Sequence, residues 1–225
     1  MILFNDEFLF VHNPKTAGTS LVEYLRKTLR EPIHTAGVAE LGTYHPHLSM
    51  SLGYAAAKME KLPDQFSKIL AVVRNPYDRE VSMYFYYRDY LFKIPALARY
   101  LNDKRMEEAV QMSAKLPFGE YLCWLVDSRG TCDIWSSRHY YALQDGSVPK
   151  SLEIVRIEEL DTKIPEIMAP FIRSGTESVQ LNHINATEHA PYMSYYESKT
   201  EEIVFNSYRW MFDKGYCSRP ATLKK

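Results

Sequence analysis

Cysteine is scarce in this chain, which has three among its 225 residues and no CxxC pair. An odd number without such a pair argues against a disulfide framework and against a zinc ribbon. We therefore expect Cys123, Cys132 and Cys217 to remain free thiols of a reducing compartment. The chain also lacks an HExxH motif and any Cys/His ligand spacing, so we expect no metal cofactor.

An excess of charge of one sign and a long apolar run are missing too. The chain has 27 Lys and Arg against 28 Asp and Glu, so no global positive field attracts nucleic acid. No stretch reaches the roughly 18 apolar residues that a membrane span requires. The first apolar run has no basic segment before it and is interrupted at residues 5–7, which argues against a signal peptide. We expect a cytoplasmic protein with no transmembrane segment and no nucleic-acid partner.

The rest of the composition, 46% hydrophobic and 24% charged, is that of a globular chain, and we expect a single domain over residues 1–225. Compact apolar runs predict buried strands at 7–12, 69–73 and 152–157. Helical spacing predicts helices at 17–29, 49–62, 77–92, 164–172 and 199–213, with irregular segments at 31–47 and 174–195. The repeated order of strand, loop and helix predicts a three-layer α/β fold whose central, mostly parallel sheet is flanked by helices.

The first motif is the segment HNPKTAGTSL, residues 12–21, which joins a predicted strand directly to a helix. The first N–H groups of a helix have no partner inside it, and they lie at the positive end of its dipole. Gly18 lets the backbone approach a ligand closely, and Lys15 adds a full positive charge. Hydroxyl donors are supplied by Thr16, Thr19 and Ser20. These residues predict a cradle for a phosphate-like anion, the alternative being a well-capped strand-to-helix turn.

This segment is not a Walker A loop. In GxxxxGK[ST] the lysine follows the second glycine, whereas Lys15 precedes Gly18 and no Walker-type glycine stands upstream.

The second motif, VVRNPYDREVSMYFYY, covers residues 72–87. Arg74 stands where a predicted strand ends, at the sheet edge where ligands of open α/β folds gather. Pro76 and Asp78 suit the first turn of a helix, and Ser82 follows Asp78 by four residues. A guanidinium at a strand end and a hydroxyl on the next helix can hold a second phosphate.

Taken together, the two motifs resemble those of the sulfotransferases that use 3′-phosphoadenosine 5′-phosphosulfate (PAPS) as the sulfuryl donor. The pattern is similar to the carbohydrate sulfotransferases, including the heparan sulfate 2-O-sulfotransferase branch, and weaker similarity continues to about residue 216. Because the chain starts almost at its first strand, without the anchor of the Golgi enzymes, we expect a soluble, bacterial-type member.

The resemblance implies a P-loop-like sulfotransferase fold and a role for each motif. The 5′-phosphosulfate loop is formed by Lys15, Thr16, Ala17, Gly18, Thr19 and Ser20. Arg74 and Ser82 hold the 3′-phosphate, and Arg138 and Arg219 are candidates for a further anchor.

Two histidines lie between the motifs, in the segment YHPHLS at residues 44–49. A sugar hydroxyl is a poor nucleophile at neutral pH, and histidine is the side chain suited to take its proton. The pattern resembles the 2-O-sulfotransferase branch, where the second histidine is the base. The resemblance thus implies that His47 is the catalytic base, that His45 positions the acceptor and that Lys15 stabilises the leaving group. The other histidines are expected in structural or surface roles.

The predicted function is transfer of a sulfuryl group from PAPS to a hydroxyl acceptor, with 3′,5′-ADP as the product and no metal. The acceptor is expected to be a carbohydrate or glycoconjugate such as a glycolipid; a lipid, a peptide tyrosine or a natural-product hydroxyl are alternatives. One rival is a P-loop phosphotransferase or kinase, whose lysine order and Mg-binding aspartate are missing here. Another is a non-catalytic protein that binds 3′-phosphonucleotides or glycans.

Overall fold

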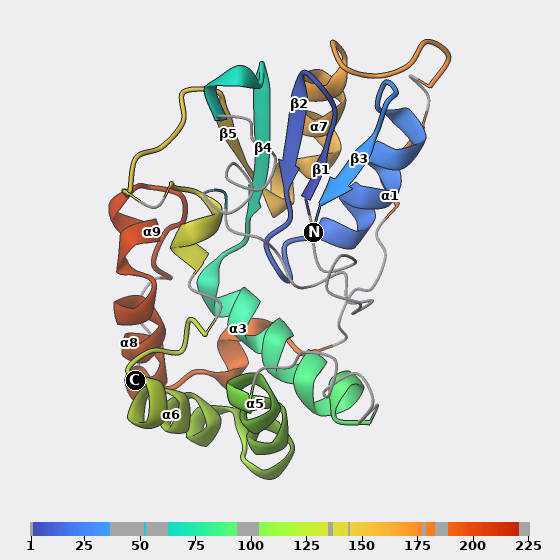
Figure 1. The fold of residues 1–225 in the computed structure, drawn as a ribbon. Helices are drawn as coiled ribbons and strands as arrows, with labels where there is room; N and C mark the ends of the chain where they lie inside the picture. The colour runs from blue at the N-terminus through green and yellow to red at the C-terminus, as the bar shows by residue number, and fades with distance from the viewer. Residues whose placement is uncertain are drawn as a thin grey trace. The chain divides into compact units, whose positions relative to one another are not determined.

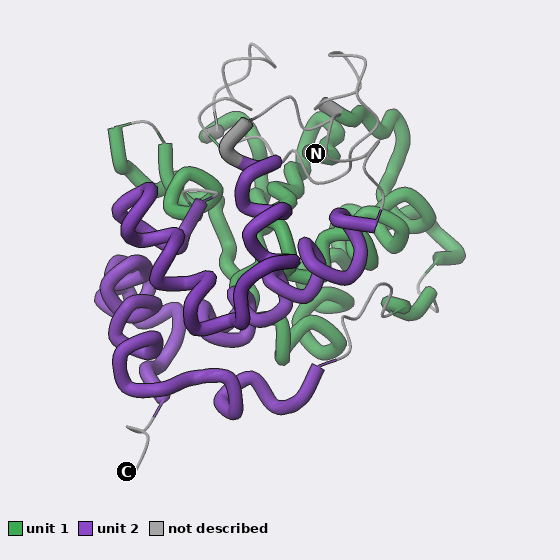
Figure 2. The backbone as a smooth tube through the Cα atoms, turned by 90° about the horizontal axis from the view of Figure 1, so that it is seen from below, with its two compact units in different colours: residues 1–73, 137–186 green, residues 74–136, 187–225 purple. Residues whose placement is uncertain are grey.

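A computed structural model describes residues 2–36, 52, 63–93, 104–134, 137–143, 145–176, 179–182 and 189–220. The chain forms two compact units, and each is built from two stretches of sequence (Figure 2). Unit 1 comprises Met1–Val73 and Ser137–Ala186, and unit 2 comprises Arg74–Ser136 and Thr187–Lys225.

Unit 1 contains a five-stranded sheet among its described residues, in the order β3-β1-β2-β4-β5. The strands are β1 (Ile2–Phe4), β2 (Phe8–Val11), β3 (His34–Ala36), β4 (Lys68–Val73) and β5 (Leu152–Arg156). β2, β4 and β5 pair in parallel, whereas β1 pairs antiparallel with β2 and with β3. Four of these five strands therefore run in one direction, which agrees with the predicted mostly parallel sheet.

The three predicted strands are confirmed to within one residue at either end, and two short strands were not predicted. β3 contradicts the irregular structure expected at residues 34–36. β1 and β3 have three residues each, too few to show alternation in the sequence. Their conformation is set by pairing, since β1 pairs with β2 and β3 pairs with β1 at the edge of the sheet.

Helices α1 (Gly18–Thr28) and α7 (Leu160–Met168) pack against one face of this sheet (Figure 1). The core between them includes alternate strand residues, such as Phe8 and Phe10 of β2 and Leu70 and Val72 of β4. The intervening strand residues, including Leu9 and Ala71, are buried as well. Burial on both faces explains why these strands are continuous apolar runs.

The prediction for α7 was displaced along the chain. A helix was expected at residues 164–172, but it starts at Leu160 and ends at Met168. Pro165 lies inside this helix and has no N–H to donate to the carbonyl of Asp161. The helix tolerates this loss because Leu160, Ile164 and Met168 are buried in the core.

Unit 2 is helical in its described part. It contains α3 (Pro76–Phe85), a π-helical continuation η3 (Tyr86–Leu91), α5 (Lys104–Lys115), α6 (Phe118–Arg129), α8 (Ser198–Ser207) and α9 (Arg209–Asp213). Short 3-10 turns complete the two units at η2 (Pro63–Gln65), η4 (Ser137–Tyr140), η5 (Ile157–Glu159) and η6 (Tyr192–Tyr195). The helix predicted at 77–92 is confirmed over α3 and η3, while η6 lies inside the segment expected to be irregular. Apart from Leu52, the helix predicted at 49–62 falls outside the described residues.

The single helix predicted at 199–213 is wrong, because α8 and α9 are separated at Tyr208. This residue leaves helical geometry, with φ −113° and ψ 17°. Its side chain is fully buried, and its hydroxyl bonds to Arg79 and Glu80 of α3. Tertiary anchoring of one tyrosine thus overrides the continuous helical pattern.

In unit 1, the imidazole of His12 packs against the start of α1 at Gly18. His12 is 1% exposed, and a Cβ built on Gly18 would lie 1.9 Å from its Cδ2 atom. No other residue type fits at position 18 without displacing the ring. The contact with the His12 ring therefore explains why position 18 is a glycine.

We predict that Gly18→Ala lowers the free energy of unfolding by about 1–3 kcal/mol, the usual range for overpacking. Gly119→Ala in α6 is a matched control, since its new Cβ would meet only Thr200 Cγ2 at 3.5 Å. Urea denaturation should show the loss for Gly18→Ala alone, and adding His12→Ala should recover part of it. Equal stability of the two single variants would contradict the packing role.

Candidate functional site

The two predicted phosphate motifs begin at the same edge of the unit 1 sheet. β2 and β4 are parallel neighbours, with Val11 paired to Ala71, so their carboxyl ends lie together. The first motif follows Val11, and Arg74 is the residue after Val73, the last of β4. This is the edge where open α/β sheets bind ligands.

The loop between β2 and α1 has an unusual backbone. Lys15 and Ala17 adopt φ values of 63° and 60°, and they are the only non-glycine residues with positive φ in the described part of the chain. This left-handed region costs an L-residue about 1–2 kcal/mol. Such strain clusters at ligand clamps, and turns of this kind direct successive N–H groups into an anion-binding concavity. The backbone geometry supports the predicted cradle.

The start of α1 also leaves its amides without a side-chain cap. Ala17 is the N-cap residue, and its carbonyl accepts the N–H of Leu21 at 3.1 Å. Of the predicted hydroxyl donors, Thr16 donates to the carbonyl of Asn13 at 2.8 Å and thereby closes the loop. Ser20 is 2% exposed, whereas Lys15, Ala17 and Thr19 are partly exposed.

Asn13 anchors this loop to the sheet. Its side-chain amide donates to the hydroxyl of Tyr141, which donates to the carbonyl of Val72 at 2.8 Å. Asn13 and Tyr141 are 2% and 1% exposed, so this relay is buried. Sequence reasoning missed both residues. The one available signal was a polar residue placed directly after a buried strand and before a proline.

The second motif begins α3 as predicted. The Asn75 side chain accepts the N–H of Tyr77 at 3.0 Å, and Pro76 and Asp78 lie in the first turn. Arg74 donates from Nε to Asp78 Oδ2 at 2.7 Å and is 16% exposed. Ser82 is fully buried in α3.

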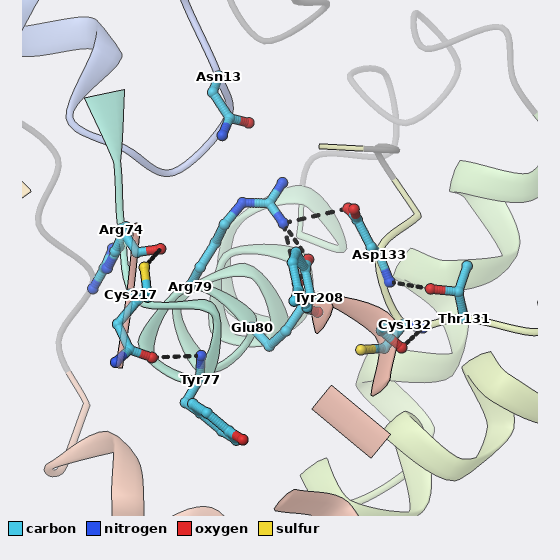
Figure 3. A network of polar contacts seen from close by, with 12 residues as sticks. Asn13, Arg74, Tyr77, Arg79, Glu80, Thr131, Cys132, Asp133, Tyr208 and Cys217 are labelled. Atoms are coloured by element: carbon cyan, nitrogen blue, oxygen red, sulfur yellow. Dashed lines mark hydrogen bonds and ion pairs between the residues drawn. The ribbon is translucent and has the colours of Figure 1, made fainter. Parts of the chain in front are cut away.

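The C-terminal segment of unit 2 lies beside the start of this motif (Figure 3). The Cys217 thiol donates to the carbonyl of Arg74 at 3.8 Å, and Asn75 donates to the carbonyl of Ser218 at 3.5 Å. The candidate anchor Arg219 is engaged by Glu201 and Glu202 at 2.7 and 2.6 Å. The other candidate, Arg138, is exposed in unit 1.

A buried charged network holds α3 within unit 2 (Figure 3). Arg79 is 2% exposed and contacts Glu80 at 3.2 Å and Asp133 at 3.6 Å, and Tyr208 donates to Glu80. Burial raises the pKa of Glu80 to about 7, against the opposing effects of Arg79 and the Tyr208 hydrogen bond. A nearby second carboxylate, Asp133, raises it further.

The stability of the protein should therefore fall as pH rises through this range. Unfolded Glu80 loses its proton near its ordinary value of 4.5, whereas folded Glu80 keeps it until about pH 7. Between these values the native state binds the extra proton, so raising the pH destabilises it, by up to about 3 kcal/mol. Urea unfolding at pH 5 and pH 7.5 should show this drop in wild type. Glu80→Gln should remove it, and the exposed Glu166→Gln should retain it. A drop that persists in Glu80→Gln would assign it to other groups.

His45 and His47 lie outside the described residues. Cys123, Cys132 and Cys217 take part in no disulfide bond, and burial raises the pKa of the Cys132 thiol well above its ordinary value. Within the described residues, no group of three His, Cys, Asp or Glu side chains could hold a metal ion. No helix in that part of the chain is long and apolar enough to cross a membrane.

No family model matches the chain, and no curated protein is similar to it in sequence. Its fold is the α/β, P-loop-like fold of sulfotransferases, as the motifs predicted. The comparison is with the crystal structure of mouse sulfotransferase SULT7A1 complexed with PAP. The two chains are 19% identical with a TM-score of 0.51, over 95% of this chain and 86% of the mouse chain. Similarity at this identity establishes the fold.

Proposed function

We propose that residues 1–225 form a single-domain, cytoplasmic sulfotransferase that transfers a sulfuryl group from PAPS to a hydroxyl acceptor. The observation that carries this proposal is the strained loop after β2, where Lys15 and Ala17 adopt left-handed conformations in a sulfotransferase fold. Strained backbone conformations persist only where the surrounding structure enforces them, and they cluster at active sites and ligand-binding loops. The mouse protein of the same fold was crystallised with PAP, which agrees with a 3′-phosphonucleotide ligand.

The donor is held at both ends in this proposal. The loop residues hold the 5′-phosphosulfate through their amides, hydroxyls and one ammonium group; they are Lys15, Thr16, Ala17, Gly18, Thr19 and Ser20. Arg74 and Ser82 hold the 3′-phosphate. The Thr16 hydroxyl donates to the carbonyl of Asn13, so in this proposal Thr16 contributes to the cradle through its backbone amide. PAPS carries about four negative charges, and in this proposal Lys15, Arg74 and the dipole of the helix supply the positive field that binds it.

The reaction follows from the residues assigned to it. His47 would take the proton of the acceptor hydroxyl as its oxygen bonds to sulfur. The bond between sulfur and the bridging oxygen breaks at the same time, and 3′,5′-ADP leaves. Lys15 would stabilise the charge developing on that bridging oxygen, a preorganised effect worth about 3 kcal/mol. Alignment of donor and acceptor removes much of the entropic cost of the encounter.

The acceptor proposed is a carbohydrate or glycoconjugate, with His45 positioning it. This rests on the similarity of YHPHLS to the heparan sulfate 2-O-sulfotransferase branch. The aromatic residues that the structure describes are largely committed to packing, since Tyr77, Tyr87, Tyr121 and Tyr141 are all at most 2% exposed. The abundance of tyrosine therefore gives no separate support for a sugar-binding surface.

We predict that the protein transfers labelled sulfate from PAPS to a glycan in a panel of glycans, lipids, phenols and small alcohols. Lys15→Ala should reduce transfer by at least about 100-fold, because one preorganised charge is lost. Lys150→Ala removes an exposed lysine and should leave the rate unchanged. The control is thermal unfolding of the protein with each nucleotide. If ATP–Mg raises the unfolding temperature more than 3′,5′-ADP does, the protein is not a sulfotransferase and a phosphotransferase is favoured.

The proposed role of His47 as the catalytic base can be tested separately. His47→Ala should lower turnover by about 100-fold or more, the usual contribution of a general base. Its affinity for 3′,5′-ADP, measured by calorimetry, should stay near that of wild type because the donor site is intact. Unchanged turnover in His47→Ala would show that another group takes the proton.

A further inference from the structure

Asp78 shares its carboxylate between the candidate phosphate anchor and a histidine from a distant part of unit 2. One oxygen, Oδ2, accepts from Arg74 Nε at 2.7 Å. The other oxygen, Oδ1, lies 3.9 Å from Nε2 of His189. The three side chains are only 16%, 20% and 10% exposed, so solvent screens their interaction weakly.

The hydrogen bonds of His189 fix the position of its proton. Nδ1 lies 2.8 Å from the carbonyl oxygen of Ala190, which can only accept, so Nδ1 carries the hydrogen. In the neutral ring, Nε2 then presents its lone pair to the carboxylate of Asp78. Protonation at Nε2 converts this contact into an ion pair.

The surroundings of His189 hold the ring in this orientation. Phe85 of α3 stacks on it, with ring centroids 5.9 Å apart and planes at 17°, and Tyr195 of η6 contacts it edge-on at 6.4 Å. The guanidinium of Arg88 also lies over the Phe85 ring, with its Cζ atom 4.4 Å from the ring centroid. The titratable and charged groups around the pair are thus Arg74, Arg88, Tyr195 and, beside Asp78, Tyr196.

We propose that Asp78 and His189 are positioning residues for Arg74, and that protonation of His189 strengthens the grip of Arg74 on a 3′-phosphate. This inference rests on the proposed function. Asp78 orients the guanidinium through Nε, but its negative charge also opposes an approaching phosphate dianion. A protonated His189 neutralises that charge while Asp78 stays bonded to Arg74. The affinity for a 3′-phosphate therefore becomes linked to pH.

Because protonated His189 favours the bound anion, binding of the anion must favour protonated His189 by the same factor. Imidazole is the side chain that changes charge between pH 5 and 8. Binding of 3′,5′-ADP should then be accompanied by proton uptake at His189. Any loss of protons from the phosphate itself occurs equally in a variant without the imidazole.

The test compares 3′,5′-ADP with 5′-AMP, which lacks the 3′-phosphate, by calorimetry at pH 6 and pH 8 in buffers of different ionisation enthalpy. His189→Asn keeps a donor for the Ala190 carbonyl and removes the titrating nitrogen. For each protein, the preference is the affinity for 3′,5′-ADP divided by the affinity for 5′-AMP. From pH 8 to pH 6 this preference should rise about fivefold more in wild type than in His189→Asn, which is a typical coupling. Wild type should also take up more protons than the variant. His34→Gln, an exposed histidine on β3, should behave as wild type.

The same calorimetric comparison is made with Asp78→Asn. It should reduce the pH dependence of the preference for 3′,5′-ADP over 5′-AMP to that of His189→Asn, because the carboxylate that pairs with protonated His189 is gone, while 5′-AMP affinity stays unchanged. If Arg74→Ala loses the preference but His189→Asn keeps the pH dependence of wild type, the positioning proposal is wrong and the proposed function stands. If wild type shows no preference for 3′,5′-ADP at all, the proposed function itself fails.

Discussion

The structure depends on a loop that runs from β2 into α1 in a backbone conformation that most residues avoid. Lys15 and Ala17 are held in the left-handed region, and this arrangement is unfavourable unless neighbouring contacts enforce it. The enforcing contacts are visible on both sides of the loop in unit 1. His12 fills the space beside Gly18, and Asn13 connects the loop through Tyr141 to β4. The result is a loop whose backbone is fixed by the protein itself, which is the preorganisation that the proposed anion cradle requires.

The second motif is supported in a different way, by charge buried beneath α3. Arg79, Glu80 and Asp133 form a buried network, and desolvation raises the pKa of Glu80 to about 7. A buried network of this kind is costly unless its groups satisfy one another, so it specifies one placement of the helix within unit 2. The same helix carries Asp78, which orients Arg74. The charges of this network and the carboxylate that orients the proposed phosphate anchor therefore lie on one helix.

Much of the fold could be predicted from the sequence because the parallel strands are continuous apolar runs, as in Phe8–Val11 and Lys68–Val73. What could not be predicted was set by tertiary contacts. The three-residue strand β3 is stabilised by pairing, and the break at Tyr208 is stabilised by bonds to α3. At the site, the motifs indicated Lys15 and Arg74 because their residue types match phosphate chemistry. Asn13, Tyr141 and His189 were missed or left in structural roles, since their partners lie more than 100 residues away along the chain.

The central claim is that the two motifs bind the two ends of one nucleotide. The most direct measurement is a calorimetric titration of 3′,5′-ADP, 5′-AMP and 3′-AMP into wild type, Lys15→Ala and Arg74→Ala. Loss of a charge-assisted hydrogen bond weakens binding by about 10- to 100-fold. Arg74→Ala should lose only the preference for nucleotides with a 3′-phosphate, and Lys15→Ala only the preference for those with a 5′-phosphate. If each variant weakens all three nucleotides equally, or neither weakens any, the two motifs do not grip separate ends of one molecule.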